Sequence, residues 1–328
     1  MNVILLAHQA NLVQRRRIPR VLRDRNDPMA FSDADLMKRY RFPRSTILDI
    51  NSVMLPYTRP SENRPNAIQP IIQKCTTLNY LATGCLYSNL QASFDVSRAS
   101  ISRIIARCVN AMIATMKEDV RFNMNELEAN ALSFHELANF PNVLGCIDGT
   151  QVAIKCPNRN EHAYVNRKGF HSINIQFICD ANMMFLDAVV KYPGSAHDSF
   201  IFGQSQIKER LLTGDFGDKW LLGDSSYALR SYLLTPYLSC NSQGERNFNR
   251  SHKRTRVQIE RSFGIPKSRF LCLSHKVSGP LPFVPEKCCK VIWRASSYIT
   301  RHASRISLIL QLSTLKTMMN KTSWLTVM

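Results

Sequence analysis

The hydrophobic pattern divides the chain into a helical first part and a second part that begins with strands. Over about the first 130 residues the segments read as mostly helical, and Pro56, Pro60, Pro65 and Pro70 mark a loop between two helix-forming stretches. After a boundary near residues 128–141, the apolar segments become short and β-branched, with glycine or polar residues between them. The pattern therefore predicts two regions of different architecture.

The clearest predicted helix spans residues 99–112, where apolar residues recur at helical spacing. A short helix-like segment at 90–96 precedes it, and Ser97 is placed to cap it. The pair resembles a helix-turn-helix, which would lay the second helix in a DNA groove. Ordinary helical bundles also carry basic outer faces, so both interpretations stay open. The basic residues expected to face DNA are Arg98, Arg103 and Arg107.

The second part predicts an α/β fold with a mixed sheet. Strands are expected at 143–147, 173–179, 184–191 and 220–222, the first three joined by hairpin turns. A helix over 199–212 separates the third and fourth strands. A later helix, over 256–263, is expected to stop near Gly264 and Pro266. This order suits a sheet with helices packed against it.

Composition excludes several classes of protein. With 45% hydrophobic residues the chain can bury a core, which argues against a disordered or fibrous protein. No apolar run approaches the roughly 18 to 20 residues that cross a bilayer, so we expect a soluble intracellular protein without a membrane partner. The ten cysteines are scattered without a C-x-x-C spacing and are expected to be reduced and mostly buried.

Basic residues outnumber acidic ones, with 43 Lys plus Arg against 24 Asp plus Glu and a formal charge of +19. This excess favours a polyanionic partner, because clustered cations release counterions from phosphate backbones. The cations concentrate at residues 15–25 and 250–261, and either cluster also fits a nuclear import signal.

Four acidic residues stand out because they lie at predicted strand ends, a helix start and a late helix. A residue that binds a divalent cation must present a hard oxygen from a rigid position, which strand ends supply. Two Mg²⁺ ions about 3.5 to 4 Å apart can activate water and stabilise the leaving oxygen of a phosphodiester. The four residues are Asp148, Asp198, Asp224 and Glu260.

Each of the four also has an ordinary structural explanation, and only their joint order along the chain favours a metal site. The alternatives are a turn at Asp148 and Gly149, a helix N-cap at Asp198, a cap by Asp224 on a helix starting at Ser225, and an ion pair of Glu260 with Arg256.

Five segments in order resemble the Harbinger transposase-derived nucleases, which are relatives of the PIF/Harbinger transposases. The resemblance covers most of residues 35–290. The segments are GCIDGTQVAIKCP at 145–157, YVNRKGFHSINIQFIC at 164–179, PGSAHDS at 193–199, LLGDSSY at 221–227 and VQIERSFGIPKSRFLCL at 257–273.

The resemblance implies an RNase H-like DDE endonuclease with Asp148, Asp224 and Glu260 as catalytic residues. Asp148 and Asp224 would bridge or flank Mg²⁺ or Mn²⁺ ions, Glu260 would hold the second ion, and Asp198 would be an outer ligand or support one. The implied reaction is hydrolysis of a DNA phosphodiester by water without a covalent enzyme intermediate. A Myb-like DNA-binding partner is also implied. We expect the protein in the nucleus and also in the cytoplasm.

The expected organisation is a basic segment at 1–34, a helical region with the helix-turn-helix-like unit at 35–135, a nuclease domain at 140–290 and a divergent tail at 291–328. The resemblance implies that relatives continue after Ile292 with a Cys-x-Val-Leu-His-Asn helix. For one choice of synonymous codons from Trp293 onward, a one-base frame change would encode that pattern. We therefore hypothesise that the tail from about Trp293 is a frameshift product; a genuinely divergent tail is the alternative. Further DNA contacts are expected at Arg167, Lys168, Lys253, Arg254 and Arg256.

Two other functions compete with DNA hydrolysis. A domesticated DNA-binding or partner-recruiting protein would keep the fold with a silent nuclease site. RNA hydrolysis would use the same metal chemistry.

Overall fold

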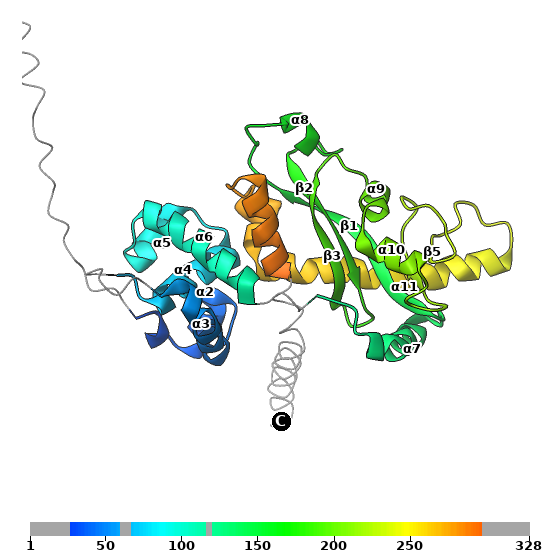
Figure 1. The fold of residues 1–328 in the computed structure, drawn as a ribbon, viewed down its shortest axis with the longest axis horizontal. Helices are drawn as coiled ribbons and strands as arrows, with labels where there is room; N and C mark the ends of the chain where they lie inside the picture. Colours follow the sequence, from blue (N-terminus) through cyan, green and yellow to red (C-terminus); the bar gives the residue numbers. More distant parts are fainter. Residues whose placement is uncertain (1–26, 60–66, 116–119, 297–328) are drawn as a thin grey trace, which may run out of the picture.

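The computed structural model describes residues 27–59, 67–115 and 120–296 (Figure 1). The basic residues at 15–25 and the tail at 297–328 lie outside the described residues. The elements of the first part are α2 (Asp33–Tyr40), α3 (Arg44–Thr58), α4 (Pro70–Thr83), α5 (Tyr87–Phe94), α6 (Arg98–Thr115) and α7 (Leu127–Ala138). Those of the second part are β1 (Val143–Ala153), α8 (Glu161–Tyr164), β2 (Ser172–Cys179), β3 (Phe185–Pro193), α9 (Asp198–Gly203), α10 (Gln206–Leu212), β4 (Trp220–Leu222), β5 (Leu233–Leu234), α11 (Gln243–Arg269) and α12 (His275–Ser278).

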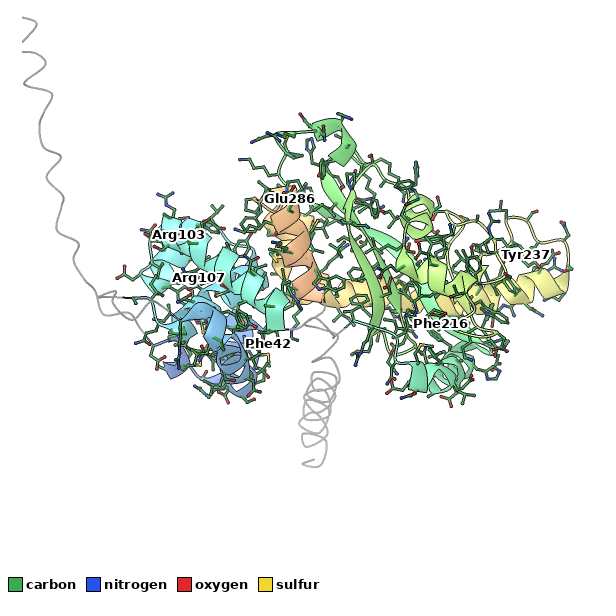
Figure 2. All side chains as sticks on the ribbon, in the orientation of Figure 1. Phe42, Arg103, Arg107, Phe216, Tyr237 and Glu286 are labelled. Atoms are coloured by element: carbon green, nitrogen blue, oxygen red, sulfur yellow. The ribbon has the colours of Figure 1, made fainter. Side chains whose placement is uncertain are left out.

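The helices α5 and α6 form where the apolar spacing predicts them. The apolar stripe of α6 is buried, and the hydroxyl of Ser97 accepts a hydrogen bond from the backbone of Ser100 at 3.3 Å, which caps the helix. Arg98, Arg103 and Arg107 are exposed, and Figure 2 shows the last two on this helical part, apart from the sheet. Their role as a DNA-binding helix-turn-helix stays a prediction.

Three helix boundaries differ from the expected ones. Pro56 lies inside the last turn of α3 instead of in a loop, so α3 lacks one backbone hydrogen bond there. The helix expected over 199–212 is broken into α9 and α10, since Ser205 caps a new start. The late helix runs from Gln243 to Arg269 and contains both Gly264 and Pro266, with Pro266 again in the final turn.

The mixed α/β sheet is confirmed, with strand order β3-β2-β1-β4-β5. Strand β1 pairs antiparallel with β2 and parallel with β4, and β2 pairs antiparallel with β3. The connection from β1 to β2 contains α8, so the expected hairpin there is wrong; β2 and β3 are joined by a short turn. The two-residue strand β5 was not expected, because so short a segment has no periodicity.

The sheet separates two hydrophobic clusters. Alternating residues of β1 and β2, such as Cys146 and Phe177, join a large cluster with α11 and the N-terminal helices. Residues on the opposite face, such as Ile147 and Ile178, join a smaller cluster with α9 and α10. In Figure 1 the long helix α11 accordingly crosses one face of the sheet and α9 and α10 the other. Since the large cluster spans both parts of the chain, the division at 135–140 stays a prediction.

Two contacts join α11 and the helix after it to the helical part. Arg269, at the end of α11, donates to the backbone oxygen of Arg41, and its guanidinium lies 4.8 Å from the centre of the Phe42 ring. A helix over 285–296 follows, and its buried Arg294 donates to the backbone oxygen of Ile113 at 2.6 Å. The first residues of the expected divergent tail thus continue a packed helix, and the frameshift stays a hypothesis.

Two expectations from composition can be compared with the structure. Within the described ranges, no helix has the length and apolar character needed to span a bilayer. All ten cysteines fall within the described residues and are free, and six of them are buried.

Lys74 on α4 is an unusual core residue. It is 0% exposed, and its ammonium donates to the hydroxyl of Thr58, while the described residues place no carboxylate within ion-pair distance. Burial lowers the pKa of Lys74 from 10.5 to about 8. The charged form is therefore a cost to the folded state at neutral pH.

Replacing this ammonium should stabilise the protein in a pH-dependent way. Between about pH 8 and 10.5 the unfolded chain holds the Lys74 proton and the folded chain does not, so stability rises with pH in that window. Lys74→Met should raise the free energy of unfolding by about 1 to 3 kcal/mol at pH 7 and by less at pH 10. Urea denaturation at both pH values measures this; exposed Lys38→Met serves as the control and should show no such difference.

Candidate active site

The parallel pairing of β1 and β4 places two of the predicted carboxylates next to each other. Cys146 pairs with Leu222, and each strand carries an aspartate two residues further on, at Asp148 and Asp224. Because parallel strands advance together, both side chains reach the same level of the sheet. Strand β4 ends at Leu222, so from Asp148 onward β1 has no neighbouring strand of the named sheet on that side.

Asp148 is the best buried of the four carboxylates. Its side chain is 16% exposed, and its two oxygens accept hydrogen bonds from the Gly149 backbone at 2.8 Å and from Arg256 at 2.9 Å. Burial raises the pKa of Asp148 to about 6, although Arg256 lowers it, and the negative charge of Asp224 raises it further. The site therefore holds a carboxylate whose charge is only partly balanced.

Glu260 is linked to Asp148 by Arg256, which binds both carboxylates. The guanidinium of Arg256 donates to Glu260, one turn further along α11, as well as to Asp148. The ordinary explanation of Glu260 as the ion-pair partner of Arg256 is thus observed. Arg256 was expected to contact DNA, but its side chain is only 18% exposed and its donors are directed at two carboxylates. In this arrangement Arg256 is the internal counter-ion of the site.

Asp198 approaches from the opposite face of the sheet. A Cβ on Gly149 would lie 2.1 Å from a carboxylate oxygen of Asp198, so only glycine leaves room for that side chain. The Asn174 amide donates to the same oxygen at 2.8 Å. Burial raises the pKa of Asp198, the Asn174 hydrogen bond lowers it, and Asp224 raises it. The negative charge of Asp224 therefore acts on both Asp148 and Asp198.

Asp224 closes a turn instead of capping a helix. Its carboxylate accepts hydrogen bonds from the backbone of Ser226 at 3.0 Å and from the Ser226 hydroxyl. The segment after it is a turn, so the expected alternative of a helix starting at Ser225 is wrong. This local turn holds Asp224 in place beyond the end of β4.

A buried tyrosine that the sequence analysis did not predict, Tyr227, lies near the carboxylates. The Gln176 amide donates to the Tyr227 hydroxyl at 2.9 Å and to the backbone oxygen of Asp198 at 3.0 Å. Burial raises the pKa of Tyr227, and the negative charges of three aspartates raise it further. This links β2, α9 and the turn after β4. The three aspartates are Asp198, Asp148 and Asp224.

A cavity of about 320 Å³ is lined by Gly149, Thr150 and Gln151 of β1 and, of the four carboxylates, by Asp198. Arg167 and Lys168, expected to contact phosphates, line it together with Asp198. Lys267 was missed by the sequence reasoning, and its ammonium donates to the Thr150 hydroxyl at 2.6 Å. Burial lowers the pKa of Lys267, and the positive charge of Lys168 lowers it further. Three cations therefore surround one wall of a cavity that carries an acidic group on another.

The donor set fits a hard divalent cation. Carboxylate oxygens of Asp148, Asp224 and Asp198 converge on one end of the sheet, and the buried side-chain oxygen of Asn174 has no hydrogen-bond partner in the described part of the chain. Across the described ranges, no three of the four predicted carboxylates bring oxygens within 4.8 Å of one another. The four carboxylates thus lie near one another, but no three of them have oxygens close enough to share one ion. Arg256 lies between Asp148 and Glu260.

The remaining predicted DNA contacts lie outside this cluster. Lys253 and Arg254 are exposed on α11, one turn or less before Arg256. The arginines of α6 lie on the helical part (Figure 2). They form separate basic surfaces.

Comparisons with known proteins agree with this architecture. A family model described as DDE superfamily endonuclease matches residues 147–296, four residues past Ile292, where the resemblance was expected to end. The Homo sapiens protein named "Putative nuclease HARBI1" is similar, with 34% identity over 80% of this chain and 75% of its own. The Mus musculus protein of that name has 35% identity over the same shares. "Protein ALP1-like" of Arabidopsis thaliana has 22% identity over 70% of this chain and 61% of its own. No solved structure matches.

The raised pKa of Asp148 predicts a stability gain when its charge is removed. The folded pKa is about 6 and the ordinary value 3.8, so ionised Asp148 costs nothing below about pH 4 and its full penalty above about pH 6. In chelator, Asp148→Asn should stabilise the protein by about 1 to 3 kcal/mol at pH 7.5 relative to its effect at pH 4. Denaturant titrations at both pH values measure this. A gain that is equal at both pH values, or equal to that of exposed Asp49→Asn, would contradict it.

Proposed function

The chain belongs to the Harbinger transposase-derived DDE nucleases, and from this premise we propose that it cuts DNA by divalent-metal-dependent hydrolysis of phosphodiester bonds. The observation that carries the proposal is the position of Asp148 and Asp224 at one level of two parallel strands, with Glu260 joined to Asp148 through Arg256. The strand order, with β1 central and parallel to β4, supports an RNase H-like fold.

Asp148, Asp224 and Glu260 are the residues that would hold the cations, with Asp198 and Asn174 on the flank. When bound, Mg²⁺ or Mn²⁺ would supply a nucleophilic water and stabilise the leaving oxygen. Asp148 and Asp224 present their oxygens from rigid positions, at a strand and at a hydrogen-bonded turn. Arg256 balances and orients Asp148 and Glu260, which reduces the repulsion between carboxylates.

The cationic wall of the cavity would receive the DNA backbone. Lys267 is held towards the cavity by Thr150, and Arg167 and Lys168 lie on the opposing loop. Phosphate oxygens bound there would lie beside the carboxylates, which places a phosphodiester next to the metal-binding groups. A cavity that combines cations and carboxylates is what hydrolysis of a polyanion requires.

The outlying basic surfaces would extend the contact with DNA. The α6 arginines and the exposed cations of α11 carry charge that suits sequence-independent phosphate binding. We also propose a Myb-like partner for sequence recognition and a nuclear location, in line with the basic clusters of the chain.

The direct test is a plasmid-nicking assay in Mg²⁺ or Mn²⁺. Wild type should nick DNA, and Asp148→Ala should reduce the rate by at least about 10²-fold, because it removes a group that holds the cations. Asp187→Asn is a matched control, since Asp187 is a half-buried aspartate of β3 whose pKa burial also raises to about 6. It should retain activity.

Other outcomes of this assay would replace the proposal. Equal activity of wild type and Asp148→Ala would remove the assigned site. Binding without nicking by the wild type would indicate a domesticated binder with a silent nuclease. Faster cleavage of competing RNA would identify RNA as the substrate.

Lys267 should contribute to DNA binding through a single phosphate contact. In chelator, Lys267→Gln should weaken DNA binding about 3- to 10-fold and lower the slope of log affinity against log salt by about 1. Fluorescence anisotropy with a labelled duplex at several salt concentrations measures both. Lys290→Gln, an exposed lysine on the 285–296 helix, is the control, and an equal loss there would mean that net charge alone is responsible.

A further inference from the structure

A second group of metal-ligand side chains lies on the 154–171 connection, apart from the four carboxylates. The Cys156 sulfur, a Glu161 carboxylate oxygen and a ring nitrogen of His171 all lie within 4.8 Å of one another. Among the described residues, no other His, Cys, Asp or Glu group meets this criterion. We propose that these three residues form a binding site for a transition-metal ion of the Zn²⁺ class.

The distances suit such an ion with small side-chain rotations. The Nε2 atom of His171 lies 3.0 Å from the Glu161 carboxylate. Tetrahedral zinc has bonds of about 2.0 to 2.3 Å, which places neighbouring ligand atoms about 3.3 to 3.8 Å apart. The His171–Glu161 distance is slightly shorter than that range, and the two distances to the Cys156 sulfur are at most 4.8 Å, so side-chain rotations of about 1 Å would bring the three atoms to ligand spacing.

The donor set selects the kind of ion. A thiolate, an imidazole and one carboxylate are ligands of zinc and similar metals, whereas Mg²⁺ and Ca²⁺ prefer oxygen ligands. Three protein ligands leave a fourth position for water. The ordinary explanation is an exposed ion pair between Glu161 and His171, with the Cys156 thiol hydrogen-bonded to the Glu161 carboxylate and to the Pro157 backbone oxygen. Metal titration distinguishes this arrangement from a bound ion.

The backbone holds the three residues independently of any ion. Ile154 donates to the His171 backbone oxygen at 2.9 Å, and Lys155 donates to that of Leu281 at 2.9 Å, which anchors the chain just before Cys156. On the other side, Val165 and His171 form a bridge across the turn at Gly169, whose φ is +77°. The short helix α8 is pinned because Ser195 donates to Ala163 at 3.1 Å. These bonds therefore fix the backbone around the three ligand residues before any ion binds.

The ion would clamp the loop that carries the cationic wall of the cavity. Arg167, Lys168 and Phe170 line the cavity and lie between Glu161 and His171 in the chain. A bond from each end of this segment to one ion would restrict its movement, and a third bond would join it to the end of β1. The site would thus act on the geometry of phosphate binding, without taking part in hydrolysis.

Cobalt titration of the full-length reduced protein tests the proposal, because Co²⁺ bound by a thiolate gives a sulfur-to-cobalt charge-transfer band in the near ultraviolet. We expect the band to saturate near one equivalent, to be displaced by Zn²⁺ and to weaken at low pH, since binding releases the Cys156 thiol proton. Cys156→Ser should abolish the band, and His171→Gln should weaken binding at least about 10-fold. Cys240→Ser, a partly exposed cysteine elsewhere, should leave it unchanged.

Two further measurements separate this site from the proposed active site and from simple misfolding. Asp148→Asn should keep the band, whatever its nuclease activity. Hydrogen exchange over residues 157–171 should slow on addition of Zn²⁺ in wild type and not in Cys156→Ser, whose metal-free exchange should match that of wild type. Absence of the band, its persistence in Cys156→Ser, or its loss in Cys240→Ser would overturn the proposal.

Discussion

The parallel pairing of β1 with β4, and its early end, is the constraint on which the proposed active site depends. The pairing brings Asp148 and Asp224 to one level, although 75 residues of chain lie between them. Because β4 ends at Leu222, it no longer pairs with β1 beyond Cys146, and Gly149, Thr150 and Gln151 of the following stretch line the cavity. The early end of β4 thus matters alongside its direction.

Acidic groups at this edge carry a cost that the rest of the chain offsets. The protein has a formal charge of +19, yet Asp148, Asp198 and Asp224 lie together, and burial raises the pKa of Asp148 and Asp198. Arg256 supplies the nearest positive charge. Such an arrangement is costly for folding alone, and groups of this kind occur where chemistry requires them. Lys74 differs from them, because this buried charge of the helical part has no carboxylate partner within the described ranges and lies apart from the acidic cluster.

The sequence allowed four of the five strands and the α6 helix to be predicted, because each depends on local periodicity, although β1 continues past its expected end at Ile147 to Ala153. The assignment of the acidic residues, which depends on motif order, stays a prediction. It did not allow the start of α11 to be predicted, since residues 243–255 are so polar that no apolar stripe marks a helix. The roles of Lys267, Tyr227 and Arg256 depend on contacts between distant elements, to Thr150, Gln176 and Asp148. The approach of Asp198 from the opposite face follows from the alternation of β1, which became visible once the register was known.

The 27 residues of α11 form one continuous helix, about 40 Å long, that joins the proposed active site to the helical part. Its middle carries Arg256 and Glu260, its last turn carries Lys267, and its final residue, Arg269, is bound to Arg41 and Phe42 of the helical part. A displacement of the N-terminal helices relative to the sheet would therefore also move α11, and with it Arg256 and Glu260.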